Sequence, residues 1–154
     1  MSGYIFLASS KEIELPEKIA EYNNRRIFDE PNKSFTLSVP TEQDEWEIEQ
    51  LRKIVTMPYI YYIGGLGSEY FWLYLEKYME VGDVLEIISI YQQDETDIYV
   101  QKMLDNPEPI HINVGSLTYT NAYGNFQLNR KKWVDDLMHR TLVTDRGVTT
   151  IVKY

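Results

Sequence analysis

The sequence predicts one compact α+β domain over residues 1–154, in which a mixed β-sheet with a central βαβ unit carries three to four helices. Three observations lead to this class. A length of 154 residues suits a single hydrophobic core, and 44% hydrophobic with 25% charged residues is typical of globular chains. Short strand-like and helix-like patterns also follow one another without a linker or an internal repeat.

The first part of the chain predicts two strands and two helices. Residues 3–8 are mostly apolar and end at two serines, which indicates a strand, and Pro16 suits the first turn of a short helix. Apolar residues alternate over residues 35–39, as in a half-buried strand. Thr41 can cap a helix over residues 42–55, whose acidic start and basic end match the helix dipole.

The middle of the chain predicts a strand, a glycine turn, a helix and a second strand. An aromatic apolar run over residues 58–63 meets the glycine-rich turn 64–68, and a broadly apolar helix over residues 69–80 ends before Gly82. Residues 84–91 are apolar on both faces, so we expect an interior strand that is covered on both sides. These elements form the predicted βαβ unit.

The last part of the chain predicts a meander or hairpin followed by a helix and a closing strand. Asn129 can cap the helix, which we expect over residues 130–142, and Gly147 precedes the last strand, residues 148–152. The short strands of the meander are expected at residues 98–103, 110–114, 117–120 and 126–128.

Charge and composition narrow the classes of function. The net charge is -9, and it is concentrated in residues 1–97, which hold 19 acidic and 8 basic residues. An acidic chain repels nucleic acid and anionic membranes, so we expect a protein partner with a basic surface. With no long apolar run and no basic leader, we expect a cytoplasmic protein without a membrane span or signal peptide. The absence of cysteine excludes disulfides, thiolate metal sites and a cysteine nucleophile.

The glycine turn is a candidate anion site. The backbone N–H groups of Gly64, Gly65, Gly67 and Ser68 could converge on a phosphate or carboxylate at the start of the following helix. Against this, Glu69 places a carboxylate at the first helical position, and neither the P-loop lysine nor the dinucleotide-binding spacing is present. The other interpretation is a tight turn in which Ser68 caps the helix.

Trp46 marks a second candidate site. On the helix over residues 42–55 it lies roughly 150° from the centre of the apolar stripe. Its surroundings on the helix are acidic, with Glu42, Glu45 and Glu49. An exposed tryptophan among glutamates fits a surface that binds a basic partner, whereas the alternative is that another element covers Trp46.

The start of the last helix carries Arg130, Lys131 and Lys132, where the helix dipole disfavours positive charge. These residues could join the glycine turn in binding an anion. Alternatively they form solvated ion pairs four residues apart, as the sequence allows for Lys131 with Asp135, Lys132 with Asp136, and Asp136 with Arg140.

No catalytic, metal or cofactor site is predicted. His111 and His139 are expected at the surface, and the nucleophile-elbow and zinc-protease motifs are absent. The leading hypothesis is therefore a non-enzymatic acidic domain that binds a protein, as an inhibitor, immunity-type factor or regulator. The alternative is a domain that binds a small anionic or nucleotide-like ligand between the glycine turn and the basic helix start, with catalysis left open.

Overall fold

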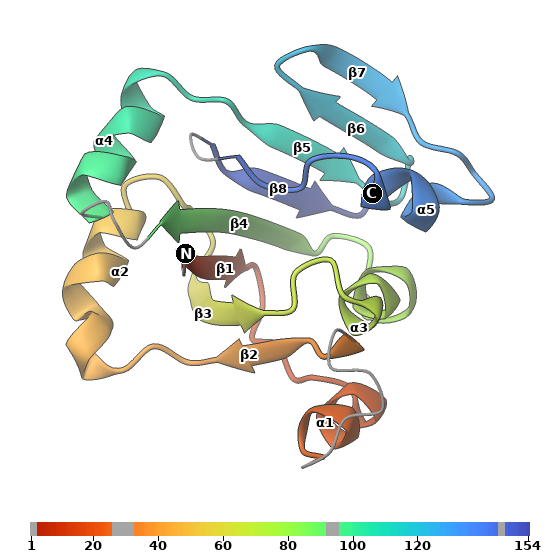
Figure 1. Cartoon of the computed structure of the whole chain (residues 1–154), viewed down its shortest axis with the longest axis horizontal. Helices are drawn as coiled ribbons and strands as arrows, with labels where there is room; N and C mark the ends of the chain where they lie inside the picture. The colour runs from red at the N-terminus through yellow and green to blue at the C-terminus, as the bar shows by residue number, and fades with distance from the viewer. Residues whose placement is uncertain (1–2, 26–32, 92–95, 145–146) are drawn as a thin grey trace.

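A computed structural model describes residues 3–25, 33–91, 96–144 and 147–154 of the chain. Their strands form one eight-stranded mixed sheet in the order β2-β3-β1-β4-β8-β5-β6-β7, with five α-helices beside it (Figure 1). This confirms the predicted α+β class. None of the described helices is long and apolar enough to cross a membrane.

In chain order, the elements are β1 (Gly3–Ser9), α1 (Glu17–Asn23), β2 (Thr36–Ser38), the 3₁₀ turn η2 (Glu42–Asp44), α2 (Glu45–Leu51), β3 (Tyr59–Gly64), α3 (Glu69–Leu73), the π-helical turn η3 (Tyr74–Tyr78), β4 (Val84–Tyr91), α4 (Thr96–Asp105), β5 (Ile110–Asn113), β6 (Thr118–Asn121), β7 (Gly124–Gln127), α5 (Trp133–Met138) and β8 (Thr149–Val152).

The predicted βαβ unit does not consist of two neighbouring strands, because β1 lies between β3 and β4. Phe6 of β1 is opposite Tyr62 on one side and Ile88 on the other, and both pairings are antiparallel. Strands β3 and β4 therefore run in the same direction without pairing to each other. β1 fits this interior position because its side chains are buried on both faces, with Phe6 in one apolar cluster and Leu7 in the other.

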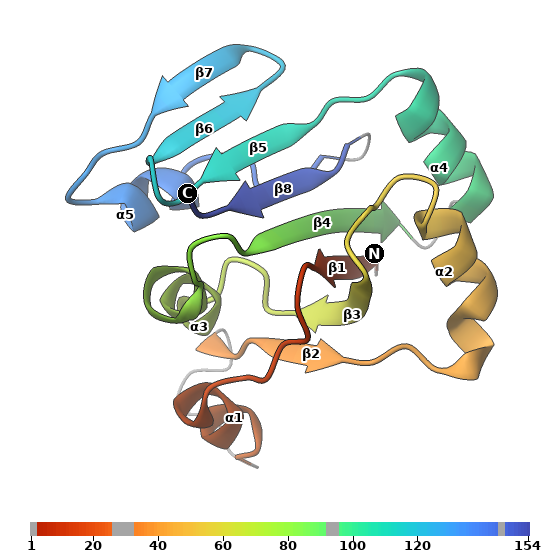
Figure 2. The same cartoon turned by 180° about the vertical axis from the view of Figure 1, so that it is seen from behind.

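Two hydrophobic clusters cover the opposite faces of the sheet. Successive side chains of β4 alternate between them, since Ile87 belongs to the cluster under α1, α3 and α5, and Ile88 to the cluster under α2 and α4. Both isoleucines are fully buried, which contributes about 1.5–3 kcal/mol for each side chain. The prediction that residues 84–91 form an interior strand covered on both sides is thus confirmed. Helices α2 and α4 lie side by side at one end of the strands, and α1 and α3 lie at the other (Figures 1 and 2).

The strand predicted for residues 98–103 is wrong, because this segment belongs to helix α4. Tyr99, Val100 and Met103 are buried on one side of the helix, whereas Ile98 and Leu104 are exposed. Spacings of one, three and four residues are those of a helix face. The meander of β5, β6 and β7 is confirmed, and α5 and β8 follow it as predicted.

Three predicted helices have different bounds in the structure. The helix expected over residues 42–55 is the turn η2 followed by α2, and it ends at Leu51. The helix expected over residues 69–80 is α3 continued by one π-helical turn. The helix expected over residues 130–142 is limited to Trp133–Met138. It begins late because the side chain of Asn129 binds the backbone N–H groups of Lys131 and Lys132, which precede the helix.

Candidate functional site

The glycine turn after β3 has a backbone that favours glycine. Gly65 and Gly67 have φ angles of 79° and 80°, in the left-handed region that other residues rarely adopt. A Cβ atom on Gly65 would lie 1.8 Å from the carbonyl oxygen of Ser34. Gly65 is therefore needed where the turn touches the segment that precedes β2, which is a structural use of this glycine.

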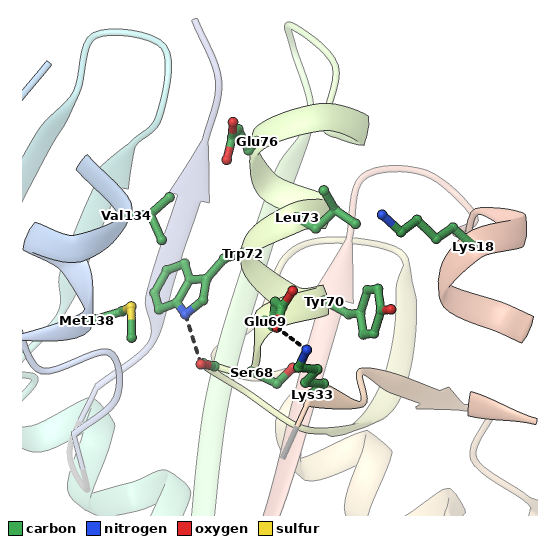
Figure 3. Close-up of a pocket in the computed structure, with 11 residues that line it drawn as sticks. Lys18, Lys33, Ser68, Glu69, Tyr70, Trp72, Leu73, Glu76, Val134 and Met138 are labelled. Carbon is green, nitrogen blue, oxygen red and sulfur yellow. Dashed lines mark hydrogen bonds and ion pairs between the residues drawn. The ribbon is translucent and has the colours of Figure 1, made fainter. Parts of the chain in front are cut away.

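The groups around this turn already have partners. Ser68 caps α3, because its hydroxyl oxygen accepts a hydrogen bond from the backbone N–H of Phe71 at 3.3 Å. The indole N–H of Trp72 donates to the carbonyl of Gly67 at 2.8 Å (Figure 3). Glu69 forms an ion pair with Lys33, with a distance of 3.2 Å between Nζ and Oε2.

A hollow of about 500 Å³ lies beside the glycine turn (Figure 3). Gly67 and Ser68 line it, whereas Gly64 and Gly65 do not. Its walls come from α3 and from the side chains of α1 and α5 that face α3, and its charged groups are two lysines and two glutamates. These are Lys18, Lys33, Glu69 and Glu76.

The basic helix start adjoins this hollow. Lys131 and Lys132 line a smaller hollow of about 190 Å³, and the two hollows share Glu76 and a valine of α5, whereas Arg130 lines neither. The N–H groups of Lys131 and Lys132 donate to Oδ1 of Asn129 at 2.9 and 3.0 Å. These two backbone donors are therefore not available to an anion.

Asp136 of α5 binds one residue that precedes the helix and one that follows it. One carboxylate oxygen of Asp136 accepts from the N–H of Asn129 at 3.1 Å, and the other binds Nε of Arg140 at 2.9 Å. The predicted pair of Asp136 with Arg140 thus forms, and the guanidinium of Arg140 also lies 5.2 Å from the ring centre of Tyr119.

Helix α2 presents the second candidate site at the surface. Trp46 is 51% exposed, and Glu42, Glu45 and Glu49 are exposed as well. We call these four residues the α2 surface. The three glutamates line a hollow of about 690 Å³ together with Pro40, Thr41, Ile48, Arg52 and Ile60. No described element covers Trp46, so of the two alternatives the exposed one holds.

The negative charge of the α2 surface is not neutralised within the described part of the chain. None of its three glutamates forms an ion pair there. The neighbouring cations are used elsewhere, because the guanidinium of Arg52 donates to the carbonyls of Met57 and Pro58 at 2.6 Å each. Lys53 donates to the side-chain oxygen of Gln50 at 2.9 Å.

Glu86 fixes the loop that follows α2. This carboxylate in β4 is 7% exposed, and its Oε1 accepts from the N–H groups of Thr56 at 2.8 Å and Met57 at 2.7 Å. Glu86 thus binds N–H donors of this loop, and Arg52 binds its carbonyl acceptors. Sequence reasoning missed Glu86, although a single charged residue inside the apolar run 84–91 was a signal for a buried, hydrogen-bonded carboxylate.

An aromatic corner lies on the other side of α2, and it was not predicted from the sequence either. The ring centres of Tyr4 and Tyr62 are 6.0 Å apart at an interplanar angle of 60°, and they line a hollow of about 410 Å³ with Asp44 and Glu47. Hydrogen bonds from the Thr41 backbone and the Tyr62 hydroxyl lower the pKa of the Asp44 carboxyl, so it is ionised at neutral pH. Burial, followed by hydrogen bonding to Asp44, raises the pKa of Tyr62.

Both histidines are exposed, as predicted. His111 faces outward on β5, and Nδ1 of His139 lies 2.7 Å from the carbonyl oxygen of Asp135. Over residues 3–25, 33–91, 96–144 and 147–154, no group of three histidine or acidic side chains could hold a metal ion.

Comparison with known proteins gives no match: no family model, no curated protein and no solved structure is similar to this chain. Support for a function therefore comes from the chemistry of its surfaces.

Proposed function

We propose that this chain is a non-enzymatic binding protein whose α2 surface captures a basic segment of a partner protein, as an inhibitor, an immunity-type factor or a regulator would. One observation carries the proposal. Trp46 is half exposed on a helix whose three nearby glutamates have no ion pair within the described residues. Tryptophan is enriched among the residues that dominate binding energy, and uncompensated carboxylates attract a basic partner.

The two hollows beside α2 add to this support. One contains Glu42, Glu45 and Glu49, and the other is the aromatic corner with Asp44 and Glu47. Tyrosine rings next to carboxylates attract ammonium and guanidinium groups through cation–π and charge interactions. A basic segment that crosses α2 can therefore contact Trp46 in the middle and place cationic side chains on either side.

Hydrogen bonds hold α2 at both of its ends. At its start, the backbone N–H of Thr41 donates to Asp44 at 2.8 Å in a capping box, and at its end Glu86 and Arg52 bind the exit loop. A preorganised surface loses less conformational entropy on binding than a mobile one. This favours a binding role for α2.

The test compares partner capture by three forms of the chain: wild type, Trp46→Ala and the matched control Tyr123→Ala. Tyr123 is 89% exposed at the β6–β7 turn, far from α2 in the sheet order. For the protein retained from host lysate by the wild type, we expect Trp46→Ala to weaken affinity about 30-fold or more and Tyr123→Ala to leave it unchanged. All three should melt at similar temperatures.

Salt dependence supplies the second part of the test. Replacing Glu42, Glu45 and Glu49 with glutamine should slow association at low salt and flatten its dependence on ionic strength, as measured by surface plasmon resonance. Equal affinity of Trp46→Ala and wild type for every retained protein would contradict the proposal. So would cooperative unfolding of Trp46→Ala at a much lower temperature, since that indicates a core role.

The hollow beside the glycine turn favours a second candidate function, the binding of a small anionic or nucleotide-like ligand. Gly67 and Ser68 reach this hollow together with Lys18 and Lys33. The two glutamates of this hollow repel an anion, and Lys33 is already paired with Glu69. The hollow is therefore less suited to an anion than the α2 surface is to a cation. A rise in melting temperature with nucleotides or organic acids, lost in Lys18→Ala, would support it, and no rise would count against it.

A further inference from the structure

A fifth hollow, of about 350 Å³, lies between the loop that joins β1 to α1 and the π-helical turn η3. Both of these segments lie at the end of the sheet that carries α1 and α3, away from α2 (Figure 2). Its polar lining consists of Lys11, Glu12, Glu14, Tyr74, Tyr78 and Glu80. We call it the Tyr74 hollow.

Tyr74 is the most informative group in this lining. Its side chain is only 4% exposed, and its ring packs on Phe35 with 5.9 Å between ring centres. Its hydroxyl has no hydrogen-bond partner among the residues that the structure describes, and this oxygen is accessible to solvent at the hollow. By contrast, the hydroxyl of neighbouring Tyr61 accepts from the N–H of Ile13 at 3.0 Å.

The hydroxyl of Tyr74 faces the hollow. The charges of Lys11 and Glu80, which line the same hollow, act on it, and burial raises the pKa of Tyr74, so the phenol stays neutral near pH 7. A neutral phenol can accept a hydrogen bond as well as donate one.

The π-helical turn fixes this tyrosine. The N–H of Met79 donates to the carbonyl of Tyr74 at 2.9 Å, which places one additional residue in the turn. Lys153 then binds the carbonyl of Met79 at 2.8 Å. Single π-helical turns occur frequently at functional sites.

The charge around the Tyr74 hollow is negative. Glu12, Glu14 and Glu80 line it, and its single cation, Lys11, is already paired with Asp83 at 2.9 Å and Glu80 at 3.4 Å. A ligand with positive charge is therefore favoured. The described residues offer no group of acids that could hold a metal, so an organic cation fits better, and the volume suits a small one.

We propose that the Tyr74 hollow binds a small free organic cation with N–H donors, a primary amine or a guanidine, whose cationic group donates to the Tyr74 hydroxyl and lies near Glu14 and Glu80. This site is independent of the α2 surface. The cation supplies a hydrogen-bond partner for the Tyr74 hydroxyl, which has none among the described residues.

The experiment titrates butylammonium into the isotope-labelled full chain at constant ionic strength and follows backbone amide signals by NMR. We expect saturable shifts at residues 11–14 and 74–80. Tetramethylammonium has the same charge but no N–H donor, so it should give no saturable shift at these residues. Tyr74→Phe keeps the ring and removes the acceptor, and should weaken butylammonium binding about tenfold, whereas Tyr123→Phe should bind like wild type.

Stability provides a separate check on Tyr74→Phe. Because the hydroxyl that it removes has no partner, this variant should melt at or above the wild-type temperature. A lower melting temperature would show that the hydroxyl is bonded within the protein, which overturns the proposal. Unchanged butylammonium affinity in Tyr74→Phe, equal binding of tetramethylammonium, or no saturable shift in the wild type would each overturn it too.

Discussion

Replacing Glu86 with alanine tests whether this buried carboxylate holds the loop after α2. Its Oε1 accepts from two backbone N–H groups, of Thr56 at 2.8 Å and Met57 at 2.7 Å, and from the Thr56 hydroxyl at 3.3 Å. A hydrogen bond to a charged group contributes about 1.5–3 kcal/mol. Because the loop is partly exposed, water replaces some of this, and we expect Glu86→Ala to lower the free energy of unfolding by about 2–4 kcal/mol.

Urea denaturation followed by circular dichroism measures this loss as a lower midpoint with an unchanged slope. Glu86→Gln is the matched control: it keeps the size of the side chain and one acceptor oxygen, so it should lose about half as much. Amide exchange at Thr56 and Met57 should accelerate in the alanine variant. A change within about 0.5 kcal/mol, as for an ordinary surface substitution, would refute the reasoning.

Two further predictions concern glycine and alkaline pH. Gly65→Ala places a Cβ against the Ser34 carbonyl at a φ of 79° and should lower the free energy of unfolding by about 3–4 kcal/mol. Gly82 has a φ of 96° but no atom within 4 Å of a Cβ, so Gly82→Ala should lower the free energy of unfolding by only about 1 kcal/mol. Thermal denaturation compares the two variants, and equal losses would contradict the clash at Gly65. Burial raises the pKa values of Tyr62 and Tyr119 above 10.0, so the unfolded chain loses these protons first; stability should hold below about pH 10 and fall as pH rises through the folded-state pKa values. Denaturant midpoints measured across this range should fall less steeply in Tyr62→Phe, and an identical slope would contradict the assignment.

Local periodicity explains what the sequence predicted correctly. The two-sided apolar pattern of residues 84–91 placed them inside the sheet, and the position of Trp46 on its helix put it away from the core. Helix α4 was missed because Ile98, Tyr99 and Val100 are residue types that favour strands, and in this case packing against α2 outweighs that preference.

The contacts that define the candidate sites depend on tertiary structure and could not be predicted. Glu86 meets Thr56 across 30 residues of sequence, and Lys11 meets Asp83 only because β1 pairs with β4. The lone hydroxyl of Tyr74 has no signature in the sequence, since any of the 13 tyrosines could have had one. Residue type indicates what chemistry is available, and the strand order decides which groups meet.

The place of β8 has a consequence for how the chain folds. Ile151 pairs with Leu85 of β4 on one side and with Ile112 of β5 on the other, so in the described sheet β8 alone connects β2-β3-β1-β4 to β5-β6-β7. Yet β8 follows every other strand in the sequence. During folding the edge of β4 that faces β8 therefore has no partner until residues 149–152 reach it, and this slow, long-range closure leaves that apolar edge open to aggregation or to chaperones in the meantime.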